Sequence, residues 1–239
     1  MLIVLPPSET KAPGGDGAPL DFAALSFPAL NPRRRDIAHL LASMDVEDAM
    51  AVLKVSERLR PEVEANRELF TSPTMPALER FTGVLYDALS PATLSASARS
   101  RLVVGDALFG LVGAQDLIPH YRLSAGNKLG GTTMKARWGT AIADVLGGID
   151  KLVVDLRSGA YQKLGRAPRD RTVTVRVETL RDDGTRAVVS HFNKHYKGLL
   201  ARELAESGAQ ARGADDVAEI ATAAGWVAEL RGTEVVLVV

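Results

Sequence analysis

The chain has 239 residues, of which 46% are hydrophobic, and its 29 Lys and Arg side chains balance 29 Asp and Glu side chains. These proportions are typical of a folded soluble protein, and they exclude a disordered tail, a fibre and a uniformly basic nucleic-acid coat protein. The absence of cysteine excludes disulfides, thiolate metal sites, iron–sulfur clusters and a cysteine nucleophile. No apolar run approaches the roughly 20 residues of a membrane helix, and residues 2–5 are too short for a signal peptide. We therefore expect a cytoplasmic protein with no membrane contact.

Hydrophobic periodicity predicts one strand and then mainly helices in the first half of the chain. Prolines end the opening apolar run, and Ile37, Leu40 and Leu41 recur at helical spacing. Pro61 interrupts the second helix or begins the next one. The expected elements are a strand at 1–5, a loop at 8–20, and helices at 33–44, from 45 or 47 onward, at 79–89 and at 96–102.

The second half combines strands with helices. Residues 152–156 form a nearly continuous apolar run, typical of a strand buried on both faces, whereas Val173, Val175 and Val177 alternate with polar residues, typical of a half-exposed strand. The expected elements are a helix at 136–146, strands at 152–156 and 172–180, a turn at 181–185, a hairpin partner at 186–192, a helix at 193–206, a helix from an Asp215 cap to 224 with Gly225 at C′, and a strand at 233–239. The sequence predicts one mixed α/β (α+β) domain over residues 1–239.

The neutral net charge conceals a segregation of charge along the chain. Residues 157–202 hold eleven basic and four acidic side chains, a net charge of +7, whereas residues 203–239 hold seven acidic side chains against two arginines. A segregated basic segment can focus a positive field in one cleft. The alternative is that these arginines cover the outer face of a β-hairpin.

No nucleotide or metal motif stands out. Residues 126–132 contain the letters of a phosphate-binding loop in the wrong order. His191 and His195 are four residues apart, which would suit a metal ion only on one continuous helix. We expect them on a strand and on the following helix, so the sequence predicts neither a metal site nor a cofactor.

Residues 108–118 form a glycine-bounded apolar segment between two stretches with helical character. This pattern suggests a helix–hairpin–helix-like element, whose backbone N–H groups can hold a phosphate without reading bases. The alternative is an ordinary tight connection. Downstream, residues 115–140 interleave cations with aromatic side chains, a composition that suits phosphate gripping and base stacking or, equally, coverage of a core edge by apolar stems.

Ser158 follows the buried strand at 152–156, at a strand end where open α/β sheets place ligand residues. It lacks the flanking glycines of a nucleophile elbow. We favour a polar ligand contact over a covalent nucleophile, and the alternative is a turn made by Ser158 and Gly159.

Several short stretches together resemble one known family. They are residues 1–11 (MLIVLPPSETK), 53–59 (LKVSERL), 108–111 (LFGL) leading to 118–123 (IPHYRL), 138–139 (WG), 155–161 (DLRSGAY) and 191–202 (HFNKHYKGLLAR). Their order and separation are similar to those of the YaaA family of bacterial peroxide-stress proteins along essentially the whole chain. The resemblance implies a single cytosolic α/β domain with a positively charged cleft, a helix–hairpin–helix-like element, DNA binding and a role in limiting oxidative damage.

Carried over by position, the resemblance implies that Ser158 and Tyr161 lie beside five cleft cations: Arg122, Lys128, Lys194, Lys197 and Arg202. The leading hypothesis is a peroxide-stress protein that binds duplex DNA through its backbone, without sequence specificity. Without cysteine, such a protein cannot sense peroxide through a thiol of its own.

The alternative hypothesis is an enzyme acting on a nucleotide, nucleobase or other small anionic substrate in the same cleft. Glu9 or Lys11 would then be the acid/base, Arg122 and Lys194 the anion clamp, and Tyr161 a stacking group or proton relay, with Ser158 beside them. A third possibility is a scaffold without a ligand. The oligomeric state is left open by the sequence.

Overall fold

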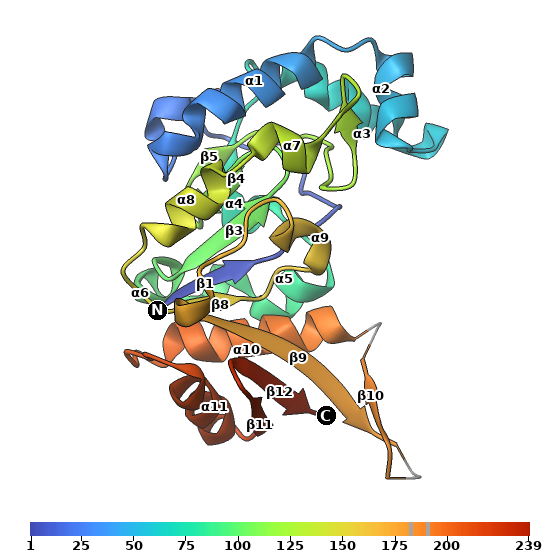
Figure 1. The fold of residues 1–239 in the computed structure, drawn as a ribbon. Coiled ribbons are helices and arrows are strands. Elements are labelled where there is room, and N and C mark those ends of the chain that lie inside the picture. Colours follow the sequence, from blue (N-terminus) through green and yellow to red (C-terminus); the bar gives the residue numbers. More distant parts are fainter. Residues whose placement is uncertain (182–183, 190–191) are drawn as a thin grey trace.

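The structure is a computed structural model, which describes residues 1–181, 184–189 and 192–239. A mostly parallel sheet runs through the molecule (Figure 1). Its strand order is β11-β12-β9-β8-β1-β3-β4, and β10 pairs with β9. The strands are β1 (Leu2–Leu5), β3 (Leu102–Asp106), β4 (Gly110–Gly113), β8 (Val153–Asp155), β9 (Thr172–Leu180), β10 (Arg186–Val188), β11 (Val227–Arg231) and β12 (Glu234–Val238). Two small ladders pair β2 (Met75–Pro76) with β5 (Leu117–Ile118) and β6 (Lys128–Leu129) with β7 (Thr132–Thr133).

The central strands β12, β9, β8, β1 and β3 are parallel to one another, and β4, β10 and β11 are antiparallel to their partners. In β1, Ile3 lies between Leu102 of β3 and Val154 of β8. The side chains of Ile3 and Leu5 are fully buried, as the apolar run predicts for a strand covered on both faces. Because these strands are parallel, the loops after β1, β3 and β8 leave the sheet at the same edge.

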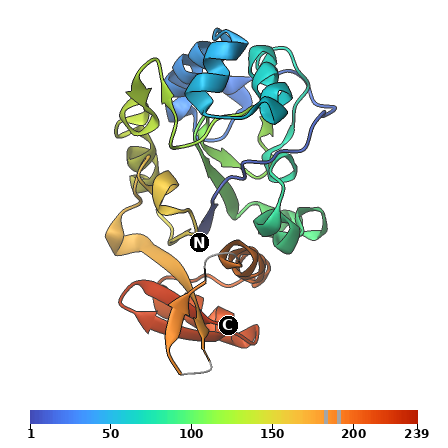
Figure 2. The ribbon, with the colours of Figure 1, turned by 90° about the vertical axis from the view of Figure 1, so that its right-hand side faces the viewer.

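Helices cover the sheet in two groups (Figures 1 and 2). Helix α10 (Asn193–Glu206) packs against α5 (Val84–Leu89), β1 and β9, and α11 (Ala214–Ala223) packs against β11 and β12. The N-terminal helices lie at the top of Figure 1, far from α10 and α11. The remaining helices are α1 (Asn31–Ala42), α2 (Val46–Leu53), α3 (Arg60–Glu64), α4 (Ala77–Arg80), α6 (Ala96–Arg99), α7 (Met134–Trp138), α8 (Ala141–Gly147) and α9 (Gly159–Gln162).

Most elements with strong local periodicity lie where the sequence predicts them. Strand β9 and helix α10 have the predicted bounds, and the alternation in β9 buries Val173, Val175 and Val177 on one face. Pro61 lies in the first turn of α3, so it begins a helix. Gly225 follows the C-cap of α11 with a φ of 90°, as predicted for C′. The mixed α/β prediction is confirmed.

The predicted helix–hairpin–helix at residues 108–118 is wrong. Leu108 and Phe109 lie in the turn between β3 and β4, and the segment continues as a buried strand. Gly110 permits this reversal, because it has a φ of 71° and a Cβ there would lie 2.8 Å from the Trp138 ring. The apolar residues are therefore a strand buried on both faces, a pattern that periodicity alone cannot separate from a helix.

Other predicted helices are shorter or begin elsewhere. The helix expected at 136–146 is broken at Gly139, which has a φ of 57° and separates α7 from α8. The helix expected at 79–89 is likewise divided into α4 and α5. Gly213, not Asp215, is the N-cap residue of α11, and Asp215 lies in the first turn, where its charge favours the helix dipole.

Two buried arginines hold the connections together, a role that the sequence did not indicate. Arg34 donates to the carbonyl oxygens of Phe109, Ser26 and Leu111, the first two at 2.8 Å. Arg80 donates to the carbonyl oxygens of the 12–14 loop and of Ile118. Both side chains are fully buried. Each guanidinium therefore supplies hydrogen bonds to several backbone carbonyl oxygens that water cannot reach. No helix in the described part of the chain is long and apolar enough to cross a membrane.

Candidate functional site

Polar residues gather at the edge of the sheet where the parallel strands β1, β3 and β8 end. Residues 8–11 follow β1, Asp106 ends β3, and residues 157–161 follow β8. In open α/β sheets, this edge is where ligands bind. The fold thereby brings Glu9, Lys11 and Tyr161 to one region, although they are far apart in the sequence.

Lys11 is the most unusual residue of this edge. Only 7% of its surface is exposed, and its Nζ lies 4.3 Å from the centre of the Tyr121 ring and 5.4 Å from that of Phe81. Nζ also donates a hydrogen bond to the Ser8 carbonyl oxygen at 3.2 Å. No carboxylate of the described residues lies within ion-pair distance of it. The ammonium is therefore held by aromatic faces and one carbonyl.

This environment changes the acidity of the lysine. Burial lowers the pKa of Lys11 from 10.5 to about 8, and the negative charges of Asp106 and Glu9 oppose the shift only in part. A lysine with a pKa near 8 populates both its charged and its neutral form around physiological pH. That property suits a proton donor or acceptor.

Asp106 is a central residue that the sequence reasoning missed. Its Oδ1 accepts the backbone N–H groups of Leu108 and Phe109 at 2.7 and 2.9 Å, which fixes the carboxylate in place. Its buried Oδ2 has no well-formed hydrogen bond to a described residue. An acidic residue directly after the apolar run at 102–105, at a strand end, is the signal that could have identified it.

Three tyrosines surround this carboxylate. Burial, and then the charge of Asp106, raise the pKa of Tyr86, Tyr121 and Tyr161 well above the ordinary value of 10. The Tyr86 hydroxyl donates to the Pro6 carbonyl oxygen at 2.9 Å. The buried Tyr121 hydroxyl lies close enough to Asp106 for hydrogen bonding to this carboxylate to add to the rise in the pKa of Tyr121. Asp106 and the three tyrosines therefore form one polar cluster at the ends of the strands.

Glu9 and Arg122 form an ion pair at the outer side of the site. Arg122 Nη2 lies 3.0 Å from Glu9 Oε2, and Nη1 donates to the Glu9 carbonyl oxygen at 2.8 Å. The Glu9 side chain is 47% exposed, whereas that of Arg122 is 16% exposed. Arg122 is thus a nearly buried cation whose carboxylate partner faces solvent.

A pocket of about 260 Å³ opens beside these residues. Exposed Lys194, at the start of α10, lines it together with Ser8, Glu9 and Thr10. The Thr10 hydroxyl is within 3.1 Å of the hydroxyls of Ser8 and Thr82. Since the Ser8 carbonyl accepts the Lys11 ammonium, Lys11 lies directly behind the wall of the pocket.

The other sequence-predicted residues have different surroundings. Lys197 is half-buried and donates to the Leu156 carbonyl oxygen at 3.3 Å, and burial lowers its pKa. Arg202 donates to the carbonyls of Leu89 and Ser90 and to Thr93 Oγ1, around the end of α5. Lys128 lies exposed in the β6–β7 ladder. None of these three residues lines the pocket, and of the predicted site residues only Glu9 and Lys194 line it.

Ser158 is exposed and precedes α9 as its N-cap residue, without a side-chain cap hydrogen bond. His195 lies on α10, and His191 lies outside the described residues. Among the residues that the structure describes, no group of three His, Asp or Glu side chains could hold a metal ion.

The fold and the site define the chain as an α/β protein with an open, mostly parallel sheet, a class in which ligands bind outside the carboxyl ends of the strands. The sequence profile of the family described as peroxide stress protein YaaA matches residues 1–229, and the chain belongs to this family. The resemblance carried by the short motifs is thereby confirmed.

Relatives match the chain over nearly its full length. A UPF0246 protein of Corynebacterium efficiens is 58% identical over 235 residues, covering 96% of this chain and 95% of the relative. A UPF0246 protein of Streptomyces coelicolor is 43% identical and covers 96% and 92%. An uncharacterized protein of Campylobacter jejuni is 26% identical and covers 84% and 82%.

Proposed function

We propose that this family member acts chemically on a small anionic or nucleobase-like substrate at the carboxyl edge of its sheet, with Lys11 as the acid/base. The observation that carries the proposal is the buried Lys11 ammonium, whose pKa is lowered to about 8 between aromatic rings and beside Asp106. Strongly perturbed titratable groups gathered in a cleft are typical of active sites.

The neighbouring residues have complementary roles in this proposal. Asp106 supplies the negative charge that keeps Lys11 from losing its proton entirely, and it faces the tyrosine hydroxyls. Arg122 and Lys194 attract an anionic group, with Glu9 leaving Arg122 when the substrate binds. Tyr161, half-buried and influenced by both Asp106 and Glu9, relays a proton or stacks on a base. Exposed Ser158 provides a polar contact at the rim.

The test is a thermal-shift screen of the purified protein against nucleobases, nucleosides, nucleotides and sugar phosphates, followed by mass spectrometry of each stabilising compound after incubation. We expect a compound that stabilises the protein and is consumed. Lys11→Met should abolish its consumption, because Met keeps the packing of the buried stem but cannot transfer a proton.

Lys135→Met is the matched control, since Lys135 is exposed on α7 and its loss should leave consumption unchanged. A compound that Lys11→Met consumes as fast as the wild type would exclude Lys11 as the acid/base. Stabilising compounds that the wild type never converts would make the site a binding site without catalysis.

The second candidate function is DNA binding without sequence specificity, in the peroxide-stress role that the family description names. It is favoured by exposed cations at 163–194 that have no ion-pair partner among the described residues: Lys163, Arg166, Arg169 and Lys194. Cations free of carboxylates can neutralise phosphates and release counterions.

A salt series with a fluorescent duplex tests this function. If four phosphates are neutralised, the slope of log K against log salt should be about −3.6. Lys194→Glu should weaken binding, whereas Lys135→Glu should have a smaller effect if the contacts are local. Binding that is absent at low salt, or independent of salt, would exclude this candidate.

A further inference from the structure

A second pocket, larger than the one beside Glu9, is lined in part by α9 and shares no lining residue with it. It encloses about 500 Å³, which is within the range of small-molecule sites. Seven of its eight lining residues have polar side chains. They come from the end of β8, from α9 and the loop after it, and from the starts of β9 and β12: Asp155, Gln162, Arg166, Ala167, Arg169, Thr172, Thr174 and Thr233. Gln162 of α9 lines this pocket, whereas the charges of Asp106, Glu9 and Arg122 act on the neighbouring Tyr161.

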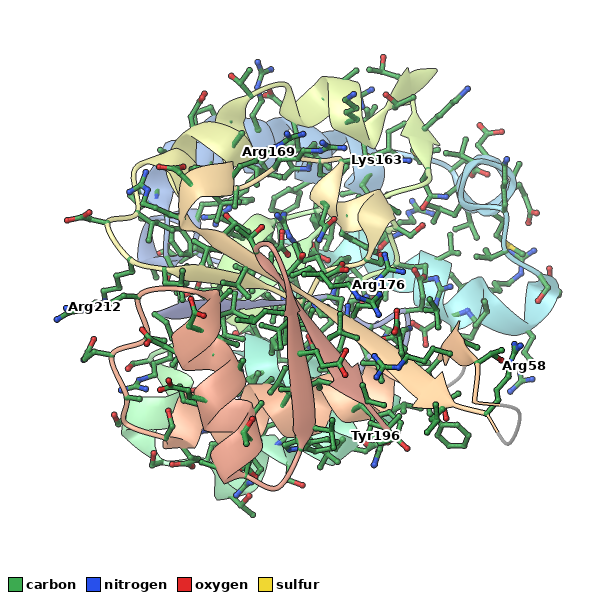
Figure 3. The ribbon with its side chains drawn as sticks, turned by 60° about the horizontal axis from the view of Figure 1, so that its bottom comes forward. Arg58, Lys163, Arg169, Arg176, Tyr196 and Arg212 are labelled. Carbon is green, nitrogen blue, oxygen red and sulfur yellow. The ribbon has the colours of Figure 1, made fainter. Side chains whose placement is uncertain are left out.

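The alternation of β9 explains why the floor of this pocket is polar. Val173 and Val175 are buried on one face of β9, so Thr172 and Thr174 lie on the opposite face. Asp155 of β8 is the register partner of Thr174 and lies beside it. Figure 3 labels Arg169 near the start of β9, Arg176 in the middle of this strand and Lys163 at the end of α9.

The charges of the pocket favour an anion. Asp155 is neutralised by Arg157, which donates to Oδ1 at 2.9 Å and to Oδ2 at 2.8 Å, and both side chains are buried. Arg166 and Arg169 are exposed, and neither has an ion-pair partner in the described ranges. Two uncompensated guanidinium groups therefore border a cavity whose carboxylate is already paired.

Uncharged polar groups are also free here. The hydroxyls of Thr174 and Thr233 and the Gln162 amide make no side-chain hydrogen bond to a described residue. The Thr172 hydroxyl, in contrast, donates to the Pro168 carbonyl oxygen at 2.5 Å. Arginine is well suited to binding the oxygens of a phosphate in pairs, and the hydroxyls and amide suit the polar body attached to it.

We propose that this pocket binds a small phosphate monoester, such as a sugar phosphate or a nucleoside monophosphate, with Arg166 and Arg169 on the phosphate and Thr174, Thr233 and Gln162 on its polar body. The site is separate from the acid/base site of the proposed function. Its ligand binds whether or not Lys11 can transfer a proton.

Calorimetric titration of the full chain with ribose 5-phosphate and with adenosine monophosphate tests the proposal, with ribose and adenosine as unphosphorylated counterparts. We expect at least one phosphate ester to bind about tenfold or more tightly than its counterpart, because its phosphate accepts charge-assisted hydrogen bonds from the arginines. Arg166→Gln/Arg169→Gln should remove this preference, and Thr174→Val should weaken binding of the ester.

Arg58→Gln is the matched control, since Arg58 is exposed at another margin of the molecule in Figure 3 and its loss should leave the titration unchanged. Lys11→Met should also bind the ester as the wild type does, which separates this proposal from the acid/base proposal. Equal binding of ester and counterpart, or an unchanged titration in the double variant, would overturn it. So would a short DNA duplex that binds through the same two arginines while neither ester binds.

Discussion

The ammonium of Lys11 lies 4.3 Å from the centre of the Tyr121 ring, and this contact replaces the carboxylate that a buried lysine usually needs. The negative charges of Asp106 and Glu9 offset the cost of burying the ammonium only in part. The protein therefore holds a charged group in a place that destabilises its charged form. Such an arrangement is typical of a residue kept for chemistry at the expense of stability.

Lys11→Met should stabilise the protein at neutral pH. The pKa of Lys11 is about 8 in the folded protein and 10.5 ordinarily, so the unfolded chain binds the proton more tightly between these values. The penalty of burying the charge is complete below pH 8 and disappears as the pH rises toward 10.5. Denaturant unfolding should show a gain on the order of 2–3 kcal/mol at pH 7.

The gain from Lys11→Met should shrink between pH 8 and pH 10.5, while the effect of Lys135→Met stays nearly constant. A gain of the same size at every pH would show that the lysine keeps its ordinary pKa. A loss of stability at pH 7 would show that the aromatic contacts outweigh the cost of burial.

Arg34→Lys should destabilise the fold. Lysine cannot reproduce the fork that reaches the carbonyls of Phe109, Ser26 and Leu111, and buried acceptors would be left without donors. We expect a loss of about 3 kcal/mol or more in the free energy of unfolding. The adjacent Arg33 is exposed, so Arg33→Lys should change that quantity little. Equal effects of the two substitutions would contradict the bracing role of Arg34.

Gly198→Ala should force α10 and α5 apart. A Cβ at this position would lie 2.3 Å from the Leu85 carbonyl oxygen and 2.9 Å from the Ala88 Cβ. Overpacking of this kind costs about 1–3 kcal/mol. Gly147 in α8 has open space around it, so Gly147→Ala should be neutral or stabilising by up to about 1 kcal/mol. Thermal unfolding of both variants checks the contrast, and a Gly198→Ala protein as stable as the wild type would contradict the close packing.

Glu9→Gln should leave stability nearly unchanged while it releases Arg122. The Glu9 carboxylate is half-exposed, so its ion pair contributes at most about 1 kcal/mol. A freed guanidinium adds positive charge beside the pocket, and duplex affinity in a salt series should stay the same or rise. Exposed Glu64 gives the control Glu64→Gln. Weaker duplex binding in Glu9→Gln than in Glu64→Gln would contradict the prediction that Glu9 holds the positive charge of Arg122 back from the pocket.

Local sequence patterns were sufficient to predict the elements whose pattern extends over many residues. The alternation of Val173, Val175 and Val177 predicted β9, and the spacing in residues 193–206 predicted α10, because each pattern spans several turns or pleats. The β3–β4 hairpin and the edge strand β11 were missed. Their short apolar runs suit a helix or a strand equally well, and only the neighbouring strand decides between them.

The residues of the candidate site were likewise predicted only in part from the sequence. Glu9, Lys11 and Tyr161 were identified by residue type and strand-end position, and Arg122 by the family resemblance. The fold brings these four residues to one region. Asp106 was missed, although its charge acts on Lys11 and on three tyrosines. Lys197 and Arg202 were proposed from the family resemblance, and their ammonium and guanidinium groups donate to backbone carbonyls.

The sequence by itself determined the class of fold, the family and the residues available for chemistry, because composition, periodicity and motif order depend on near neighbours along the chain. Only the tertiary structure decided the lowered pKa of Lys11, the pairing of Arg122 with Glu9 across 113 residues, and the position of two unpaired arginines at the second pocket. These properties depend on burial and on the distance between charges, which are set when remote segments pack together.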